Sequence, residues 1–226
     1  GASHPPRGGP WRADAAPASL APVRHRPNLQ VRCGVQVTRV LVENGRAVGV
    51  EWLGEGGRRE SARADAEVIL CAGALQTPQL LQLSGIGPAD ALRALGIAVN
   101  ADAPEVGANL QDHYQARVIV KLRERMSLND QVRSPLGLAQ MGAQWLFQQR
   151  GPLTVGAGQV GGMVRSRVAK DARADVLFNV MPLSVDKPGD ALHGFSGFSA
   201  SAAQCRPESR GSVMLRSGDP LAPPRI

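Results

Sequence analysis

The chain has 226 residues, of which 43% are hydrophobic, and this is ample for one large or two small domains with a hydrophobic core. No apolar run approaches the roughly eighteen residues that a membrane-spanning helix needs, so no transmembrane segment is expected. The formal net charge is +7, but the basic residues are scattered and nearly all arginine, and few aromatic side chains could stack on bases, which argues against nucleic acid as a partner.

The cysteines point to a reducing environment. Cys33, Cys71 and Cys205 are odd in number, lie far apart and show neither CxxC nor Cys/His spacing. Neither a disulfide framework nor a metal site is therefore expected. The predicted localisation is cytoplasmic, with a membrane-peripheral position left open. An N-terminal signal peptide also stays open, because a chain that begins at Gly1 could have lost one.

The first third of the chain predicts an irregular leader followed by a β-meander. Residues 1–24 are rich in Pro, Ala, Gly and Arg, and a short helix near 14–20 is the only regular element expected there. From 29 to 72 the pattern is that of strands. The Asn44-Gly45 pair predicts a tight hairpin, because a type I′ turn needs positive φ at both positions. A second turn is expected at 54–57, and the apolar run 66–72 is expected to be a buried strand that includes Cys71.

Residues 73–87 (GALQTPQLLQLSGIG) predict a turn, a helix and a glycine-rich exit. Pro78 suits the first turn of a helix, and Thr77 just before it is expected to cap that helix. Leucines at buried-helix spacing follow. The Ser84–Gly87 segment is expected to end the helix and to force a tight turn.

The remainder of the chain predicts two helices and an antiparallel sheet. Residues 88–95 and 136–149 predict the helices, and 116–122 alternates as a strand does. Three later runs, at 176–182, 195–204 and 211–216, are expected to be strands of one antiparallel sheet. The fold class predicted is therefore α+β or α/β.

The segment 66–87 closely resembles the second signature of the glucose–methanol–choline (GMC) flavoprotein oxidoreductases. Other segments are similar to the same family in the same order. They are RPNL at 26–29, EVGANLQDH at 105–113, RGPLT at 150–154 and RPESRG at 206–211. The resemblance covers nearly the whole chain but only the middle of the family.

The resemblance implies that the chain is part of an enzyme and contains parts of two of its domains. Residues 1–24 would be a leader, 25–114 part of an FAD-binding domain with a β-meander and a strand–helix unit, and 115–226 part of a substrate domain. The cofactor implied is FAD, and the reaction is oxidation of an alcohol CH–OH group by hydride transfer to the flavin. The family's GxGxxG phosphate loop and its catalytic His segment have no counterpart here. An internal fragment with no catalytic residue and no activity of its own is therefore expected.

Two alternatives to an enzyme fragment are open. The chain could be a non-functional remnant of such a gene, or a basic binding module. Flanking in-frame segments with GxGxxG and a catalytic His would favour the enzyme. Asp112 and His113 do not read as a catalytic dyad, because no nucleophile accompanies them.

The resemblance implies contacts with the cofactor at three positions. Val37 matches a residue whose backbone contacts the adenine of FAD, although an ordinary strand valine explains it equally well. Ala72 and Gly73 match a small pair that lets the cofactor approach the backbone closely, against the alternative of a plain strand-to-helix turn.

Gln159 bears on the substrate. It matches a position that some choline-oxidising members of the family fill with Glu, whose charge suits a quaternary ammonium group. An amide supplies no such charge. An uncharged small-molecule alcohol is therefore the predicted substrate, and the electron acceptor is unknown. The alternative is a polar strand residue with no substrate contact.

Overall fold

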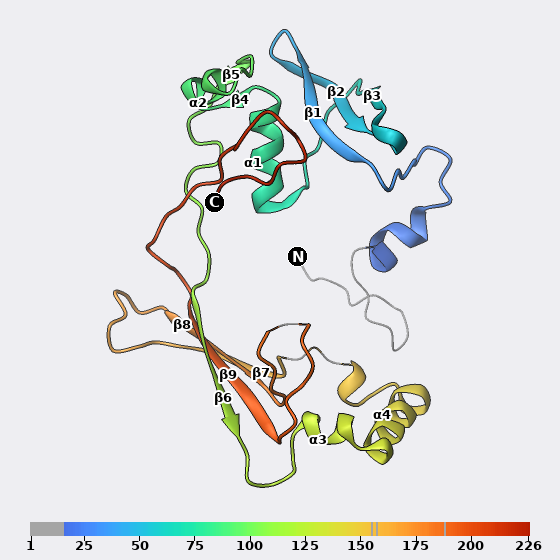
Figure 1. Cartoon of the computed structure of the whole chain (residues 1–226), viewed down its shortest axis with the longest axis vertical. Coiled ribbons are helices and arrows are strands. Elements are labelled where there is room, and N and C mark those ends of the chain that lie inside the picture. Colours follow the sequence, from blue (N-terminus) through green and yellow to red (C-terminus); the bar gives the residue numbers. More distant parts are fainter. Residues whose placement is uncertain (1–15, 155, 157, 188) are drawn as a thin grey trace. The chain divides into compact units, whose positions relative to one another are not determined.

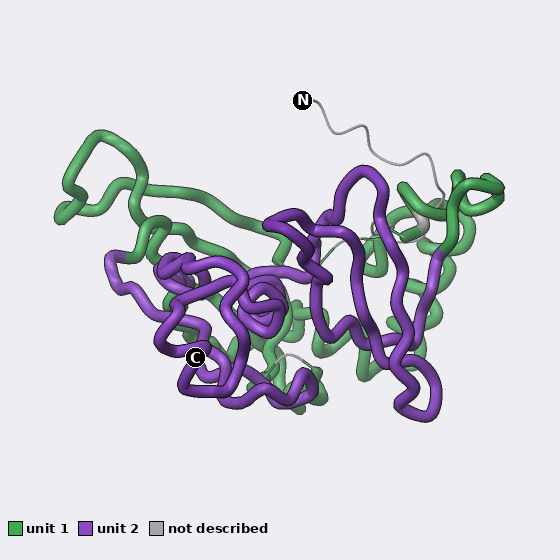
Figure 2. The backbone as a smooth tube through the Cα atoms, turned by 90° about the horizontal axis from the view of Figure 1, so that it is seen from above, with its two compact units in different colours: residues 1–30, 113–207 green, residues 31–112, 208–226 purple. Residues whose placement is uncertain are grey.

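The computed structural model describes residues 16–154, 156, 158–187 and 189–226. The chain divides into two compact units (Figure 2). Unit 1 comprises residues 1–30 and 113–207, and unit 2 comprises residues 31–112 and 208–226. Helices and antiparallel sheets occur in both, which confirms the mixed α and β class. Within the described residues no helix is both long and apolar enough to cross a bilayer.

Unit 2 begins with the predicted meander (Figure 1). Its strands are β1 (Gln36–Glu43), β2 (Arg46–Leu53) and β3 (Arg59–Arg63), in the order β1-β2-β3. Asn44 and Gly45 have φ of 51° and 75°, so the hairpin prediction is confirmed. The second turn, η3 (Glu55–Gly57), is also where the sequence places it.

The predicted buried strand at 66–72 is wrong. The segment is without regular secondary structure up to the start of the next helix, Ile69 is 72% exposed and Cys71 is exposed. An apolar run becomes a strand only when another strand takes up its backbone hydrogen bonds. No strand among the described residues pairs with it, and the meander ends at Arg63.

Helix α1 (Gly73–Leu83) starts earlier than predicted. Thr77 is not its N-cap, since that position is Ala72, which makes no side-chain cap bond. Pro78 lies inside the helix, where its missing N–H leaves the carbonyl group one turn earlier without its helical bond. The predicted exit is confirmed: Gly85 has φ of 76° and directly follows Ser84, the C-cap.

A short helix and two short strands follow α1 in unit 2. Helix α2 (Ala89–Ala94) ends at Gly96, whose φ is 72°, and the Ile97 N–H donates to the Leu92 carbonyl oxygen at 3.0 Å. This is a Schellman cap, and the helix predicted at 88–95 is confirmed. Two short parallel strands, β4 (Ile86–Gly87) and β5 (Ala101–Asp102), flank α2.

The strand predicted at 211–216 does not join the later sheet. It lies in unit 2 and forms only isolated bridges within the described residues. The reason is that segments of unit 2 distant in the sequence take up its backbone hydrogen bonds. The side chain of Gln82 donates to the Val213 carbonyl oxygen at 2.9 Å and accepts from the Leu215 N–H at 3.1 Å, and the Val213 N–H donates to the Gly107 carbonyl oxygen at 2.6 Å.

Unit 1 contains a four-stranded antiparallel sheet. Its strands, in spatial order, are β6 (Gln115–Lys121), β9 (Gly197–Gln204), β8 (Val176–Met181) and β7 (Val160–Val164). The strands predicted at 116–122, 176–182 and 195–204 are confirmed. Strand β7 was not predicted, because adjacent glycines weaken its strand pattern. Short helices η1 (Ala16–Leu20) and η2 (Ala21–Val23) precede the sheet; residues 14 and 15 of the predicted first helix lie outside the described residues.

Three helical segments follow β6. They are α3 (Leu128–Arg133), α4 (Pro135–Gln148) and η4 (Pro152–Thr154). The helix predicted at 136–149 is confirmed as α4. The short helix α3 was missed, although its Ser127-to-Asp130 capping box is a sequence signal for a helix start.

Candidate functional site

A pocket of about 220 Å³ lies in unit 2 where β1 meets α1. Val37 and Ala72, two of the three predicted cofactor contacts, both line it. The α1 residues that complete it recur at helical spacing, so they share one face of the helix. The lining residues are Val35, Gln36, Val37, Ala72, Gln76, Gln79, Leu80, Leu83 and Pro220.

The pocket combines apolar walls with a few amide groups. Val37 and Leu80 supply aliphatic surface, and the Gln79 side chain is anchored, since its Nε2 donates to the Ala222 carbonyl oxygen at 2.8 Å. Strand β1 is an edge strand, so part of its backbone faces away from β2. The Val37 carbonyl oxygen already accepts from Gln36 Nε2 at 3.2 Å. This arrangement suits a flat, largely apolar group with hydrogen-bonding edges.

Gly73 follows Ala72 at the first position of α1. Its φ is 86°, a conformation that strongly favours glycine. A Cβ built on Gly73 would meet no atom within 4 Å, whereas one built on Gly107 would collide with the Val213 carbonyl oxygen. The space beside Gly73 is therefore open to a ligand rather than filled by the chain.

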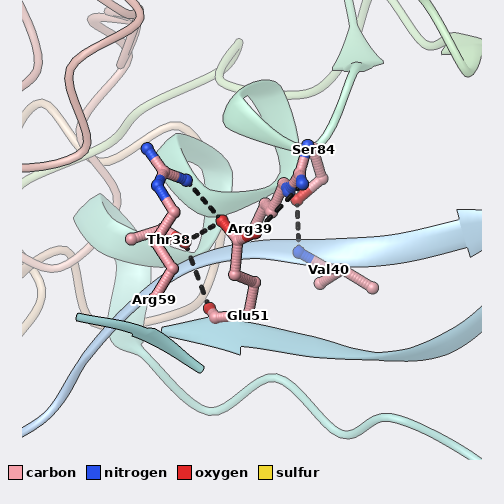
Figure 3. A network of polar contacts seen from close by, with 6 residues as sticks. All are labelled: Thr38, Arg39, Val40, Glu51, Arg59 and Ser84. Carbon is pink, nitrogen blue, oxygen red and sulfur yellow. Dashed lines mark hydrogen bonds and ion pairs between the residues drawn. The ribbon is translucent and has the colours of Figure 1, made fainter. Parts of the chain in front are cut away.

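Hydrogen bonds hold β1 in place beside α1 (Figure 3). The Val40 N–H donates to Ser84 Oγ at 2.8 Å, and that hydroxyl donates to the Leu80 carbonyl oxygen at 2.6 Å. A buried serine at the end of α1 thus fixes the edge strand that carries Val37. The spacing between the pocket walls depends on this bond.

The side chain of Glu51, on β2, is bonded to residues of both β1 and β3 (Figure 3). Its carboxylate accepts from Thr38 Oγ1 at 2.9 Å and pairs with Arg39 at 3.0 Å and Arg59 at 2.6 Å. Partial burial raises the pKa of Glu51, but the hydrogen bonds from Thr38, Arg39 and Arg59 together lower it more, so the net pKa lies below its ordinary value.

Glu51 should therefore make unit 2 sensitive to acid. Because its folded pKa is lowered, its stabilisation is complete above the ordinary value of 4.5 and is lost as the pH falls through the folded value. The difference in urea midpoint between wild type and Glu51→Gln should be constant near neutral pH and shrink in acid. The exposed turn residue Glu55, changed to Gln, is the control. A Glu51 difference that did not change with pH would contradict the assignment.

Gln159 lies in unit 1, just before β7. It is exposed, and its N–H donates to the Val180 carbonyl oxygen at 3.2 Å. It borders a groove of about 510 Å³ whose lining is apolar and polar in about equal parts, with further polar side chains from α3 and η4. The groove is lined by Met126, Leu128, Gln131, Gly151, Pro152, Thr154, Gln159 and Pro182.

Several pocket residues were missed by sequence reasoning. Gln76 and Gln79 could have been found, since both share a helical face with Leu80 and Leu83. Pro220 had no local signal, because its place in the pocket results from the return of residues 208–226 to unit 2. Among the residues that the structure describes, no group of His, Cys, Asp or Glu is arranged to hold a metal ion.

The chain is a mixed α/β protein whose unit 2 contains a pocket lined by apolar and amide side chains. Residues 7–115 match the family model described as GMC oxidoreductase. The chain is similar to the GMC oxidoreductases over nearly its whole length, as the resemblance of its motifs predicted.

Named relatives and solved structures agree with this similarity. An oxygen-dependent choline dehydrogenase of Klebsiella pneumoniae is 38% identical over 216 residues, which are 95% of this chain and 39% of the relative. Pyridoxine 4-oxidase from Mesorbium loti has a TM-score of 0.71 at 28% identity, over 94% of this chain and 37% of that one. A fungal aryl-alcohol oxidase has a TM-score of 0.76 at 26% identity, over 95% of this chain and 43% of that one. The chain thus spans about two fifths of these proteins.

Proposed function

We propose that this chain is part of an FAD-dependent enzyme that oxidises the CH–OH group of an alcohol. The observation that carries the proposal is the pocket that brings Val37 and Ala72 together in a chain similar to this family. The relatives named choline dehydrogenases support the reaction type. In this proposal unit 2, with residues 31–112 and 208–226, belongs to the FAD-binding domain, and residues 113–207 of unit 1 belong to the substrate domain.

The residues of the unit 2 pocket fit the adenosine part of FAD. Val37 and Leu80 would contact the faces of the adenine ring, and the edge of β1 offers backbone groups to the edge of the base. The open space beside Gly73 leaves room for the cofactor chain to pass close to the backbone. Bound FAD supplies the redox chemistry as the hydride acceptor. The part played by this chain is to bind and orient the cofactor, and no catalytic base is assigned to it.

For the substrate we propose an uncharged alcohol. Gln159 and the other groove residues include amides and a hydroxyl but no carboxylate, so nothing in the groove would offset a quaternary ammonium charge. Choline is the second candidate, because the relatives are named for it. The two candidates differ in one measurable quantity, the ratio of kcat/KM for choline and for a neutral alcohol.

A longer polypeptide that contains this chain should prefer the neutral alcohol. A carboxylate–cation pair in a partly dry site is worth on the order of 1–4 kcal/mol, so Gln159→Glu should shift the kcat/KM ratio toward choline by tens- to hundreds-fold. Gln148→Glu, at the exposed end of α4, is the matched control. A wild type that favours choline would defeat the substrate proposal, and an absence of alcohol oxidation and of flavin would defeat the function itself.

A further inference from the structure

Helix α4 turns its apolar side toward solvent. Leu136, Leu146 and Phe147 are 79%, 61% and 80% exposed. With Ala139 and Ala143 they form a stripe at helical spacing on the side opposite Met141, which is buried. A surface helix of a globular protein normally has the reverse arrangement. In Figure 1, α4 lies beyond the end of the sheet of its own unit, beside α3.

Exposed apolar side chains continue past α4 in the same unit. Leu153 is 54% exposed, Val160 65%, Met163 67% and Val168 85%. Every residue of β7 is exposed. Scattered single apolar residues need no explanation, whereas Leu136, Leu146 and Phe147 share one face of α4, and a contiguous apolar patch of that kind indicates a binding surface.

The same segment carries charge of one sign only. Residues 131–170, here called the acid-free segment, contain no Asp or Glu. Arg133 and Arg150 stand just outside the two ends of α4, which itself has no charged residue. Arg133 donates a hydrogen bond to the Gly194 carbonyl oxygen and Arg150 donates one to Gln148 Oε1, and both acceptors are uncharged. The segment has five cations in all: Arg133, Arg150, Arg165, Arg167 and Lys170.

We propose that the acid-free segment is a peripheral attachment surface for anionic lipid bilayers. An uncharged apolar stripe that includes Leu146 and Phe147 suits the boundary between headgroups and acyl chains. Arginines at both ends of the helix suit the lipid phosphates, and the lack of any acidic residue removes repulsion from an anionic surface. α4 is too short to span a bilayer, so it would lie in the interface.

The 226-residue chain should float with vesicles of phosphatidylcholine and phosphatidylglycerol and much less with phosphatidylcholine alone. Added salt should weaken the binding. The double variant Leu146→Glu, Phe147→Glu should lose about tenfold or more in partition coefficient, because it places two charges in the stripe. The double variant Ile69→Glu, Leu221→Glu makes the same charge change at exposed sites in unit 2 and should bind as wild type does.

A spectroscopic readout places the contact on α4. In the variant Phe147→Trp, these lipids, when their acyl chains are brominated, should quench the new tryptophan in the stripe more strongly than they quench Trp145, which lies on the Met141 side of α4. Circular dichroism must show that each variant keeps its helices and strands. The proposal is overturned if wild type does not bind anionic vesicles, or if both double variants bind equally. It is also overturned if the stripe variant instead abolishes self-association in light scattering, since the stripe would then be an interface between copies.

Discussion

Replacing Asn129 with leucine is expected to destabilise unit 1 by about 3–5 kcal/mol, a large effect for a single substitution. Asn129 is fully buried. Its Oδ1 accepts from the Ser184 N–H at 3.0 Å, and its Nδ2 lies within 3.2 Å of the carbonyl oxygens of Ser184, His193 and Phe195. Leucine has a similar size but would leave these buried backbone groups without partners, and this unpaired state is what costs free energy.

The measurement is urea unfolding of the 226-residue chain followed by circular dichroism. Gln131→Leu is the matched control, because Gln131 lies on the same helix α3 and is exposed; its effect should stay within about 0.5 kcal/mol. If Asn129→Leu also changed stability by less than about 1 kcal/mol, the account of Asn129 as the residue that joins α3 to residues 184–195 would be wrong.

The second large effect is expected at Gln82 in unit 2. Its side chain is 2% exposed and bonds both the Val213 carbonyl oxygen and the Leu215 N–H. Gln82→Leu would leave these two groups unpaired beside buried side chains, at a cost of about 2–4 kcal/mol. Because the lost bonds hold the returning C-terminal segment, residues 208–226 should detach before the meander unfolds.

Hydrogen exchange tests this directly. The amide of Leu215 should exchange much faster in Gln82→Leu than in wild type, while amides of β2 should change little. Gln76→Leu, an exposed glutamine of the same helix α1, should leave the Leu215 amide unchanged. Unaltered exchange at Leu215 in Gln82→Leu would show that the segment is held by other contacts.

Local patterns account for what could be predicted from the sequence. The Asn44-Gly45 hairpin is encoded by its own turn residues, and α4 by its own composition and the glycine and proline that follow it. The run 66–72 has the composition of a buried strand, yet strand formation depends on a partner that no local pattern can supply. The roles of Gln82 and Asn129 were not predictable, because their partners come from distant segments.

The candidate site was predictable only in part. Val37, Ala72 and Gly73 were named from family resemblance, and physical reasoning alone would have left each as an ordinary strand or turn residue. The periodicity of α1 could have added Gln76 and Gln79. Pro220 could not be foreseen, since the run at 211–216 was expected in the later sheet rather than beside Gln82.

The central claim is that the unit 2 pocket takes the adenosine part of FAD. The purified chain should carry no stoichiometric flavin, since the adenosine contacts alone are few. Titration of the isotope-labelled chain with adenosine monophosphate should nevertheless shift the amide NMR signals of Val37, Ala72 and Gly73, with inosine monophosphate as the matched control for the base edge. Weak binding with shifts confined to these positions and their pocket neighbours is the predicted result. Shifts that avoid the pocket, or no shifts at saturating nucleotide, would contradict it.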